Sequence, residues 1–267
     1  MIETTYQDGV AVLTMRHGKV NALDTALCQA LRGALDQAAD RAQAVVLTGT
    51  GTVFSAGVDL HRVLAGQDEY LTGFLPELCR AFTCLATFEL PLVAAVNGHA
   101  IAGGYILAAA ADWILMAEGT GRAGVTELVV GVPFPAIALE LLRMRTGDAP
   151  ARPLITGAAT FQAGSALDRH LIDEAVAAGD LASRSLATAR RLAALGPAFR
   201  LTKRQLRLLP LARAQDLAVL DADVAAAWQA PLTLNRIRSY MASLKPPGSS
   251  AVAAQTEVLG AAGTVAR

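Results

Sequence analysis

Two segments of the chain could each present bare backbone N–H groups to a reacting oxygen. They are residues 53–60 (VFSAGVDL) and residues 97–104 (NGHAIAGG). Each is predicted to run from an apolar strand through small residues into a helix, where the first N–H groups lack an acceptor within the helix. Two such donors aimed at one carbonyl oxygen form an oxyanion hole, which stabilises negative charge developing on that oxygen.

These two segments resemble those of the crotonase superfamily, which contains the enoyl-CoA hydratases and isomerases. The first is similar to an F-[SA]-A-G-x-D-[LI] segment and the second to an N-G-x-[AC]-x-G-G-G segment. The resemblance implies that the N–H groups of Ala56 and Gly103 are the two oxyanion donors. The alternative interpretation is a pair of glycine-rich turns in an ordinary α/β protein, but both segments in this order are far more specific than either alone.

The same resemblance gives two positions for acid–base groups, and this chain has a carboxylate at only one. Residues 123–133 (AGVTELVVGVP) are similar to F-G-x-P-E-x-x-x-G-x-x-P and place Glu127 at its glutamate, whereas Ile106 stands at the glutamate of G-G-G-x-E-L. Adding water to a double bond needs a base for the water and an acid for the α-carbon. One carboxylate can instead move a proton from C2 to C4 of a 3-enoyl thioester. Glu127, Ala56 and Gly103 are therefore the predicted catalytic residues of an enoyl-CoA isomerase.

Two other functions stay open at this point. One is enoyl-CoA hydration with Glu127 alone holding the water. The other is non-catalytic acyl-CoA binding, in which the oxyanion hole serves affinity only. A pure binder has no need of a carboxylate buried beside the thioester, and a hydratase would be expected to have two.

Residues 16–23 (RHGKVNAL) are similar to the family's R-P-x-K-x-N-A-L segment, whose loop borders the adenine end of coenzyme A. The resemblance implies a phosphate contact for Lys19, since a flexible ammonium suits a phosphate, although loop lysines are often only solvated. The residues predicted to contact acyl-CoA are Lys19, Val20, Ala56, Gly57, Val58, Asp59, Leu60 and Gly103. Coenzyme A enters as part of the substrate, so no separate cofactor is expected. The four histidines have no metal-ligand spacing and predict no metal site.

Composition is typical of a soluble protein with a small-molecule substrate. The formal charge of the 267 residues is zero and no long basic run occurs, which argues against a nucleic-acid surface or a polybasic membrane anchor. The apolar stretch at residues 100–111 is shorter than the ~20 residues of a membrane span and predicts a buried helix. The polar, acidic start is unlike a signal or transit peptide, so we expect a cytoplasmic location. Three cysteines without C-x-x-C spacing predict buried reduced thiols.

Periodicity predicts an α/β fold. Asp8-Gly9 between two apolar runs predicts a hairpin, and leucines at every fourth position after Asn21 predict an amphipathic helix capped by that residue. Strands are predicted at residues 44–48, 92–96 and 113–116. This alternation implies parallel strands covered by helices, and the family resemblance implies a crotonase-like spiral of ββα units.

Three regions are predicted along the chain: a catalytic and CoA-binding core at 1–195, a helical oligomerisation region at 196–245, and a flexible tail at 246–267. The helical region carries more apolar residues than it could bury against its own core: Leu201, Leu206, Leu209, Leu217, Leu220, Val224 and Trp228. The resemblance implies a homotrimer or homohexamer, and candidate CoA-pocket contacts at Tyr240 and Lys245.

Three further residues have predicted structural roles. Glu140 lies about two helical turns beyond the glycine–proline turn and is expected to be a surface or ion-pair residue. Asp112 is expected to make structural hydrogen bonds. His170 replaces the glycine that the family has in a turn, so the geometry of that turn is open.

Overall fold

The chain begins with a hairpin at one edge of a six-stranded sheet. The computed structural model, which describes residues 1–243, pairs β1 (Ile2–Gln7) antiparallel with β2 (Val10–Met15). Asp8 and Gly9 between them have φ values of 49° and 77°, the left-handed backbone of a two-residue hairpin turn. The hairpin predicted from Asp8-Gly9 is confirmed.

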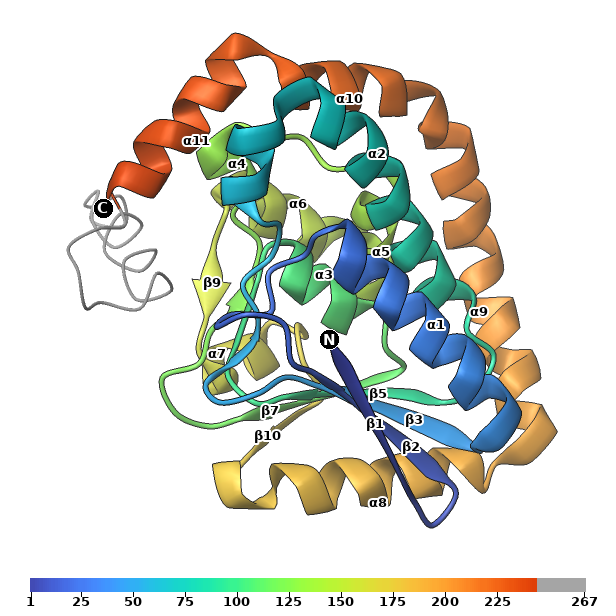
Figure 1. Ribbon diagram of the computed structural model, residues 1–267. Coiled ribbons are helices and arrows are strands. Elements are labelled where there is room, and N and C mark those ends of the chain that lie inside the picture. Colours follow the sequence, from blue (N-terminus) through green and yellow to red (C-terminus); the bar gives the residue numbers. More distant parts are fainter. Residues whose placement is uncertain (244–267) are drawn as a thin grey trace.

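The remaining strands of this sheet run parallel to one another, as the alternation of strands and helices predicted. The order is β1-β2-β3-β5-β7-β10, with β3 (Ala44–Thr48), β5 (Leu92–Val96), β7 (Trp113–Ala117) and β10 (Glu174–Val176). Alternate residues of each strand face opposite sides of the sheet. In β3, Val45 and Leu47 enter the main core, while Ala44 and Val46 enter a smaller core. Helix α8 (Leu181–Ala193) covers that second face (Figure 1).

A second, four-stranded sheet has the order β4-β6-β8-β9, with β4 (Val53–Ser55), β6 (His99–Ile101), β8 (Ala123–Gly124) and β9 (Thr160–Phe161). Strands β4, β6 and β8 are mutually parallel, and β9 is antiparallel to β8. The helix expected at residues 100–111 is therefore shorter: residues 99–101 form β6, and Ala102, with φ of 54°, separates that strand from helix α3 (Gly103–Ala109).

The two sheets are joined by repeated ββα units. Three successive units place one strand in each sheet and then a helix: β3-β4-α2 (Leu60–Thr87), β5-β6-α3, and β7-β8-α4 (Glu127–Val130). The crotonase-like spiral predicted for the fold is confirmed. Because β4, β6 and β8 are adjacent and parallel, their three strand-to-helix turns meet at the same edge of the small sheet. These turns contain the segments predicted to do chemistry.

The first helix, α1 (Thr25–Arg41), starts later than predicted. Its N-cap is Asp24, whose side chain accepts a hydrogen bond from the Leu27 N–H at 2.8 Å. Asn21, predicted as the cap, has φ of 48° and donates its side-chain amide to two carbonyls of β4 at 3.0 and 3.3 Å. A tertiary contact has therefore displaced the local capping preference of Asn21.

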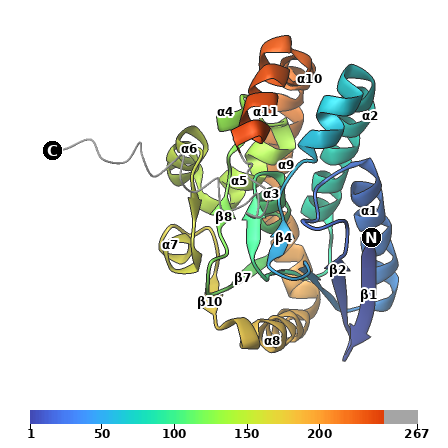
Figure 2. The same cartoon turned by 60° about the vertical axis from the view of Figure 1, so that its left-hand side comes forward.

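The remaining helices follow β8 along the chain. They are α5 (Ala136–Thr146), α6 (Asp148–Gly157), α7 (Ala163–Asp168), η1 (Ala178–Asp180), α8, α9 (Gly196–Leu217), η2 (Ala218–Leu220), α10 (Asp221–Gln229) and α11 (Pro231–Ser243). Helix α9 packs on α5, α10 on α2, and α11 on both α2 and α4 (Figures 1 and 2). The C-terminal helices thus return to the edge where the three turns meet. The predicted tail at 246–267 and Lys245 lie outside the described residues.

A buried cluster of charges attaches α9 to the core. The Asp112 carboxylate accepts hydrogen bonds from Lys203 Nζ and an Arg207 guanidinium nitrogen, both at 2.6 Å, and from the Leu92 N–H at 2.8 Å. All the charged partners are at least nine-tenths buried, so each charge depends on the others for compensation. The structural role predicted for Asp112 is confirmed.

The other structural predictions are confirmed in part. Glu140 pairs with Arg143 and Arg213 at 2.9 and 2.7 Å, but it is buried within the helix contacts and is not a surface residue. His170 has φ of 58° and so keeps a left-handed turn without glycine. Cys28 is buried, the other two cysteines are half-buried, and all three are unpaired. Among residues 1–243, no helix is both long and apolar enough to cross a membrane.

Candidate active site

The first of the three turns leads from β4 into α2. Asp59 caps this helix, because its carboxylate accepts hydrogen bonds from the N–H groups of His61 and Arg62 at 3.0 and 3.1 Å. Gly57 has φ of 86°, and a Cβ placed on it would lie 2.8 Å from the Ile101 carbonyl and 3.3 Å from the Gly103 nitrogen. This close approach requires glycine and brings the β4–α2 turn against the β6–α3 turn.

The loop before α1 pairs with the same turn and uses the Ala56 N–H. That N–H donates to the Val20 carbonyl at 3.0 Å. It is therefore not free to donate to a substrate oxygen, which corrects the prediction that Ala56 supplies the first oxyanion donor. The correction was not visible in the sequence, because the acceptor comes from a loop far away along the chain.

Val58 has the free N–H of this turn. Leu23 makes a backbone hydrogen bond to the residue on each side of Val58. The Leu23 N–H donates to the Gly57 carbonyl at 2.8 Å, and the Leu23 carbonyl accepts from the Asp59 N–H at 2.9 Å. In parallel pairing, the residue between these two bonds points its own N–H to the opposite side. The Val58 N–H has no acceptor among the described residues, and Val58 borders the pocket described below.

The second turn presents the start of α3. Gly103 is the first residue of this helix, so its N–H has no acceptor within the helix. Gly104 must also be small, because a Cβ there would lie 2.2 Å from the Ser55 carbonyl. Gly103 borders the same pocket as Val58. The prediction of Gly103 as a donor is consistent with this geometry.

The third turn carries the carboxylate. Glu127 is the first residue of α4, it is 8% exposed, and its carboxylate accepts a hydrogen bond from the Thr126 N–H at 2.9 Å. Burial raises the pKa of this carboxyl to about 7, against the opposing effect of backbone hydrogen bonds from Glu127 and Thr126. Near neutral pH both protonation states of Glu127 are therefore populated.

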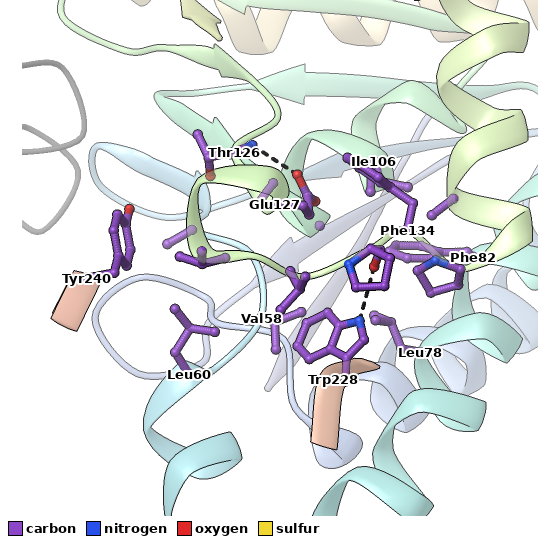
Figure 3. Close-up of a pocket in the computed structure, with 18 residues that line it drawn as sticks. Val58, Leu60, Leu78, Phe82, Ile106, Thr126, Glu127, Phe134, Trp228 and Tyr240 are labelled. Carbon is purple, nitrogen blue, oxygen red and sulfur yellow. Dashed lines mark hydrogen bonds between the residues drawn. The ribbon is translucent and has the colours of Figure 1, made fainter. Parts of the chain in front are cut away.

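These groups face the same apolar pocket. Its lining residues are Ala56, Val58, Leu60, Leu78, Phe82, Ala102, Gly103, Ile106, Thr126, Glu127, Val130, Val132, Pro133, Phe134, Pro135, Ala138, Trp228 and Tyr240. Figure 3 shows the Glu127 carboxylate beside Ile106, which is 2% exposed. Glu127 is the one carboxylate among these described lining residues, and Ile106 lies where sequence comparison expected the family's second carboxylate.

The other residues predicted to contact acyl-CoA fall into two groups, those that line the pocket and those that do not. Leu60 and Tyr240 line the pocket, whereas Gly57 and Asp59 shape the turn behind its lining. Lys19 is exposed and Val20 is half-buried in the loop before α1, outside the lining of this pocket.

The C-terminal helices contribute Tyr240 to the pocket, as predicted, but sequence reasoning missed the place of Trp228 in its lining. Trp228, predicted to face a neighbouring subunit, is 2% exposed, lines the pocket, and donates its indole N–H to the Pro133 carbonyl at 3.1 Å (Figure 3). Phe82 and Phe134 also line it and were not singled out. In the sequence these two phenylalanines look like ordinary core residues, so only the three-dimensional fold could place them in the pocket.

Comparison with known proteins decides the family. The sequence profile of the enoyl-CoA hydratase/isomerase family matches residues 5–224. The chain belongs to this family. The crotonase-superfamily membership predicted from the two glycine-rich segments is thus confirmed. Family membership supports an enzyme of the enoyl-CoA hydratase/isomerase group, with which an acyl-CoA substrate is consistent.

Individual members of the family that resemble this chain carry both names. A putative enoyl-CoA hydratase of Thermus thermophilus is 35% identical over 198 residues, which are 71% of this chain and 77% of that protein. A solved Mycobacterium tuberculosis protein is 32% identical, with a TM-score of 0.76 over 84% of this chain and 97% of the other. It is called an enoyl-CoA isomerase in that structure and a probable enoyl-CoA hydratase in a second one. The human mitochondrial delta3-delta2-enoyl-CoA isomerase is 24% identical, with a TM-score of 0.83 over 93% and 99%, which establishes the shared fold.

Proposed function

We propose that this protein shifts the double bond of a 3-enoyl-CoA to the 2-position. The observation that carries the proposal is that Glu127 and Ile106 line the same apolar pocket, so that only one of these two positions has a carboxylate. A single buried carboxylate is sufficient to move a proton between two carbons. Hydration would need a second group to hold and activate water, and the lining at position 106 is hydrocarbon.

In the proposed reaction, Glu127 takes a proton from C2 of the 3-enoyl thioester and returns it to C4. When C2 loses its proton, the C2–H electron pair forms a C1–C2 double bond and the carbonyl pair moves to the thioester oxygen. When C4 is protonated, the carbonyl re-forms, the C1–C2 pair becomes the C2–C3 double bond, and the C3–C4 pair takes the proton. The intermediate enolate carries its negative charge on the thioester oxygen. We assign the N–H groups of Val58 and Gly103 to that oxygen, with Val58 in place of Ala56. Donors of this kind contribute roughly 3–4 kcal/mol each.

The acid–base properties of Glu127 support this role. The same group must act first as a base and then as an acid, so a pKa near the working pH favours both steps. Burial raises the Glu127 pKa to about 7. A carboxylate that only contributed to binding would gain nothing from this position, because burying it opposes folding. This argues against the alternative of a non-catalytic acyl-CoA-binding protein.

Enoyl-CoA hydration is the second candidate. It is favoured by the name of the Thermus thermophilus relative at 35% identity. In that case Glu127 would act on water alone, next to Thr126 in the pocket lining.

We further propose that coenzyme A enters only as the carrier of the acyl group, with Lys19 as a phosphate contact and no separate cofactor. The assembly we propose is a homotrimer or homohexamer in the cytoplasm. Several leucines of the C-terminal helices support an assembly, because they remain exposed on the single chain: Leu201, Leu206, Leu208, Leu209 and Leu220.

One experiment separates the candidates. The protein is incubated with a 3-enoyl-CoA and, separately, with a 2-enoyl-CoA, and the products are separated by retention and weighed by mass spectrometry. Isomerisation changes retention without changing mass, while hydration adds the mass of one water. Glu127→Gln serves as the control for protein-independent rearrangement. Hydration of the 2-enoyl-CoA without isomerisation of the 3-enoyl-CoA would reject the proposal.

A further inference from the structure

The pocket has two different ends, and among the described residues only one end is bordered by partly exposed side chains. Figure 3 shows Tyr240 and Leu60 on one side of Glu127, and Trp228, Phe82 and Leu78 grouped on the other. Tyr240 and Leu60 are partly exposed. The three residues of the second group are 1–2% exposed, so no solvent lies behind them. We call Trp228, Phe82 and Leu78 the end wall.

The end wall is held in place by α10. The Trp228 indole N–H donates to the Pro133 carbonyl at 3.1 Å, and the Asp221 carboxylate at the start of the same helix accepts from the Ala136 N–H at 2.9 Å. These two bonds attach α10 near both its ends to the loop after α4 and to the first residue of α5. The indole ring therefore has a fixed place and a satisfied polar atom, as a rigid wall requires.

An acyl chain that enters past Glu127 must run toward this wall. The thioester oxygen lies at Val58 and Gly103 under the proposed function, and the reacting carbons lie at Glu127. The carbons beyond C4 then have only the apolar space between Ile106 and the end wall to occupy. They cannot leave on that side, because α2 and α10 close it.

We infer that Trp228 sets the maximum acyl-chain length, and that the substrates are acyl-CoAs whose chain ends inside the protein. This inference rests on the proposed function for the orientation of the substrate. It adds a specificity-determining residue, contributed by the C-terminal helices, to a site otherwise built from the ββα units. Affinity rises with each added carbon until the acyl chain reaches the indole, and a longer chain must displace the indole.

The test measures the binding of saturated acyl-CoAs from butanoyl to tetradecanoyl by calorimetry. Saturated chains cannot isomerise, so the result does not depend on the chemistry of Glu127. For the wild-type protein, affinity should rise about fourfold per added methylene and then stop rising at one chain length. In Trp228→Ala the rise should continue to longer chains, because the removed ring leaves space beyond the former wall.

Three variants make the result specific. Trp113→Ala is the matched control: Trp113 is the other tryptophan of the chain, also donates its indole N–H, here to Glu174 at 3.0 Å, and lies outside the pocket lining. It should keep the wild-type limit. Trp228→Phe retains a ring of smaller size and should move the limit less than Trp228→Ala. Leu78→Ala enlarges the same wall from α2 and should also move the limit, even if Trp228→Ala does not fold.

Two outcomes would overturn the inference. A wild-type affinity that rises through the whole series would show that no wall stops the chain. A limit that stays unchanged in folded Trp228→Phe and Leu78→Ala would show that these residues do not form it. If 3-enoyl-CoA is still isomerised in either case, only the length limit is rejected. If no acyl-CoA binds at all, the proposed function is rejected with it.

Discussion

Replacing Glu127 by glutamine should inactivate the enzyme and, above neutral pH, stabilise its fold. Burial raises the pKa of this carboxyl from 4.5 to about 7. Between these two pH values the unfolded chain has released the proton while the folded chain retains it, so the free energy of unfolding falls as pH rises. A pKa raised by about 2.5, at about 1.4 kcal/mol per pH unit, lowers the free energy of unfolding by about 3 kcal/mol above pH ~7. Glutamine has the shape of the protonated acid and carries no such penalty.

The assay is urea unfolding of wild type and Glu127→Gln at about pH 5 and about pH 8, at one protein concentration because assembly affects stability. The advantage of the variant should be about 2–3 kcal/mol larger at the higher pH. Comparing two pH values cancels any difference in packing. Glu77→Gln is the control, since Glu77 is equally buried but pairs with Arg32 and Arg80. That variant should show no gain on going to higher pH.

Activity should change in the opposite direction to stability. Glu127→Gln should lower turnover by about 100-fold or more, the scale of general acid–base catalysis. In the wild type, kcat/KM should rise about tenfold per pH unit below pH ~7 and then level off, as the base form becomes fully populated. An equal stability difference at both pH values, or near-normal turnover of the variant, would refute the assignment of Glu127 as the buried proton carrier.

Three further predictions concern other parts of the molecule. Ile106→Glu should introduce detectable hydration of a 2-enoyl-CoA and raise the pKa of one carboxyl of the new pair; a folded variant without hydration would contradict the position given to Ile106. Asp112→Ala leaves two buried cations without their carboxylate and should lower the free energy of unfolding by about 3–5 kcal/mol in urea. Leu206 and Leu209 are 72% and 69% exposed on α9, and changing both to aspartate should reduce the assembly to a smaller mass by light scattering. A wild-type monomer with full activity would exclude the trimer or hexamer.

The sequence predicted those elements of the fold whose patterns are local. The Asp8-Gly9 turn, the apolar strands and the alternation of strands with helices all follow from neighbouring residues. Where a tertiary contact competes with a local preference, prediction failed: Asn21 has the chemistry of an N-cap but binds β4 instead. Likewise β6 looked like part of a helix, because a strand of three buried residues and a buried helix have the same composition.

The candidate site, like the fold, could be predicted from the sequence only in part. The positions of Gly103, Ile106 and Glu127 around one pocket followed from a family resemblance carried by short segments. The choice between Ala56 and Val58 could not be made from the sequence, since it depends on which peptide pairs with the loop before α1. Trp228 could not be assigned either, because a large apolar residue fits a subunit contact and a pocket wall equally well until α10 is placed.

The division between backbone and side chain explains how one fold can serve several reactions. The two proposed donors, Val58 and Gly103, are peptide groups, and their positions follow from the pairing of the 20–23 loop and the start of α3. Substitutions that keep this pairing leave them in place. The acid–base groups are side chains on the neighbouring turns, and each can change without disturbing the backbone. Under the proposed mechanism, a hydrocarbon at position 106 beside a carboxylate at 127 therefore alters the chemistry available to the enolate, while the two backbone donors would stabilise that enolate in either case.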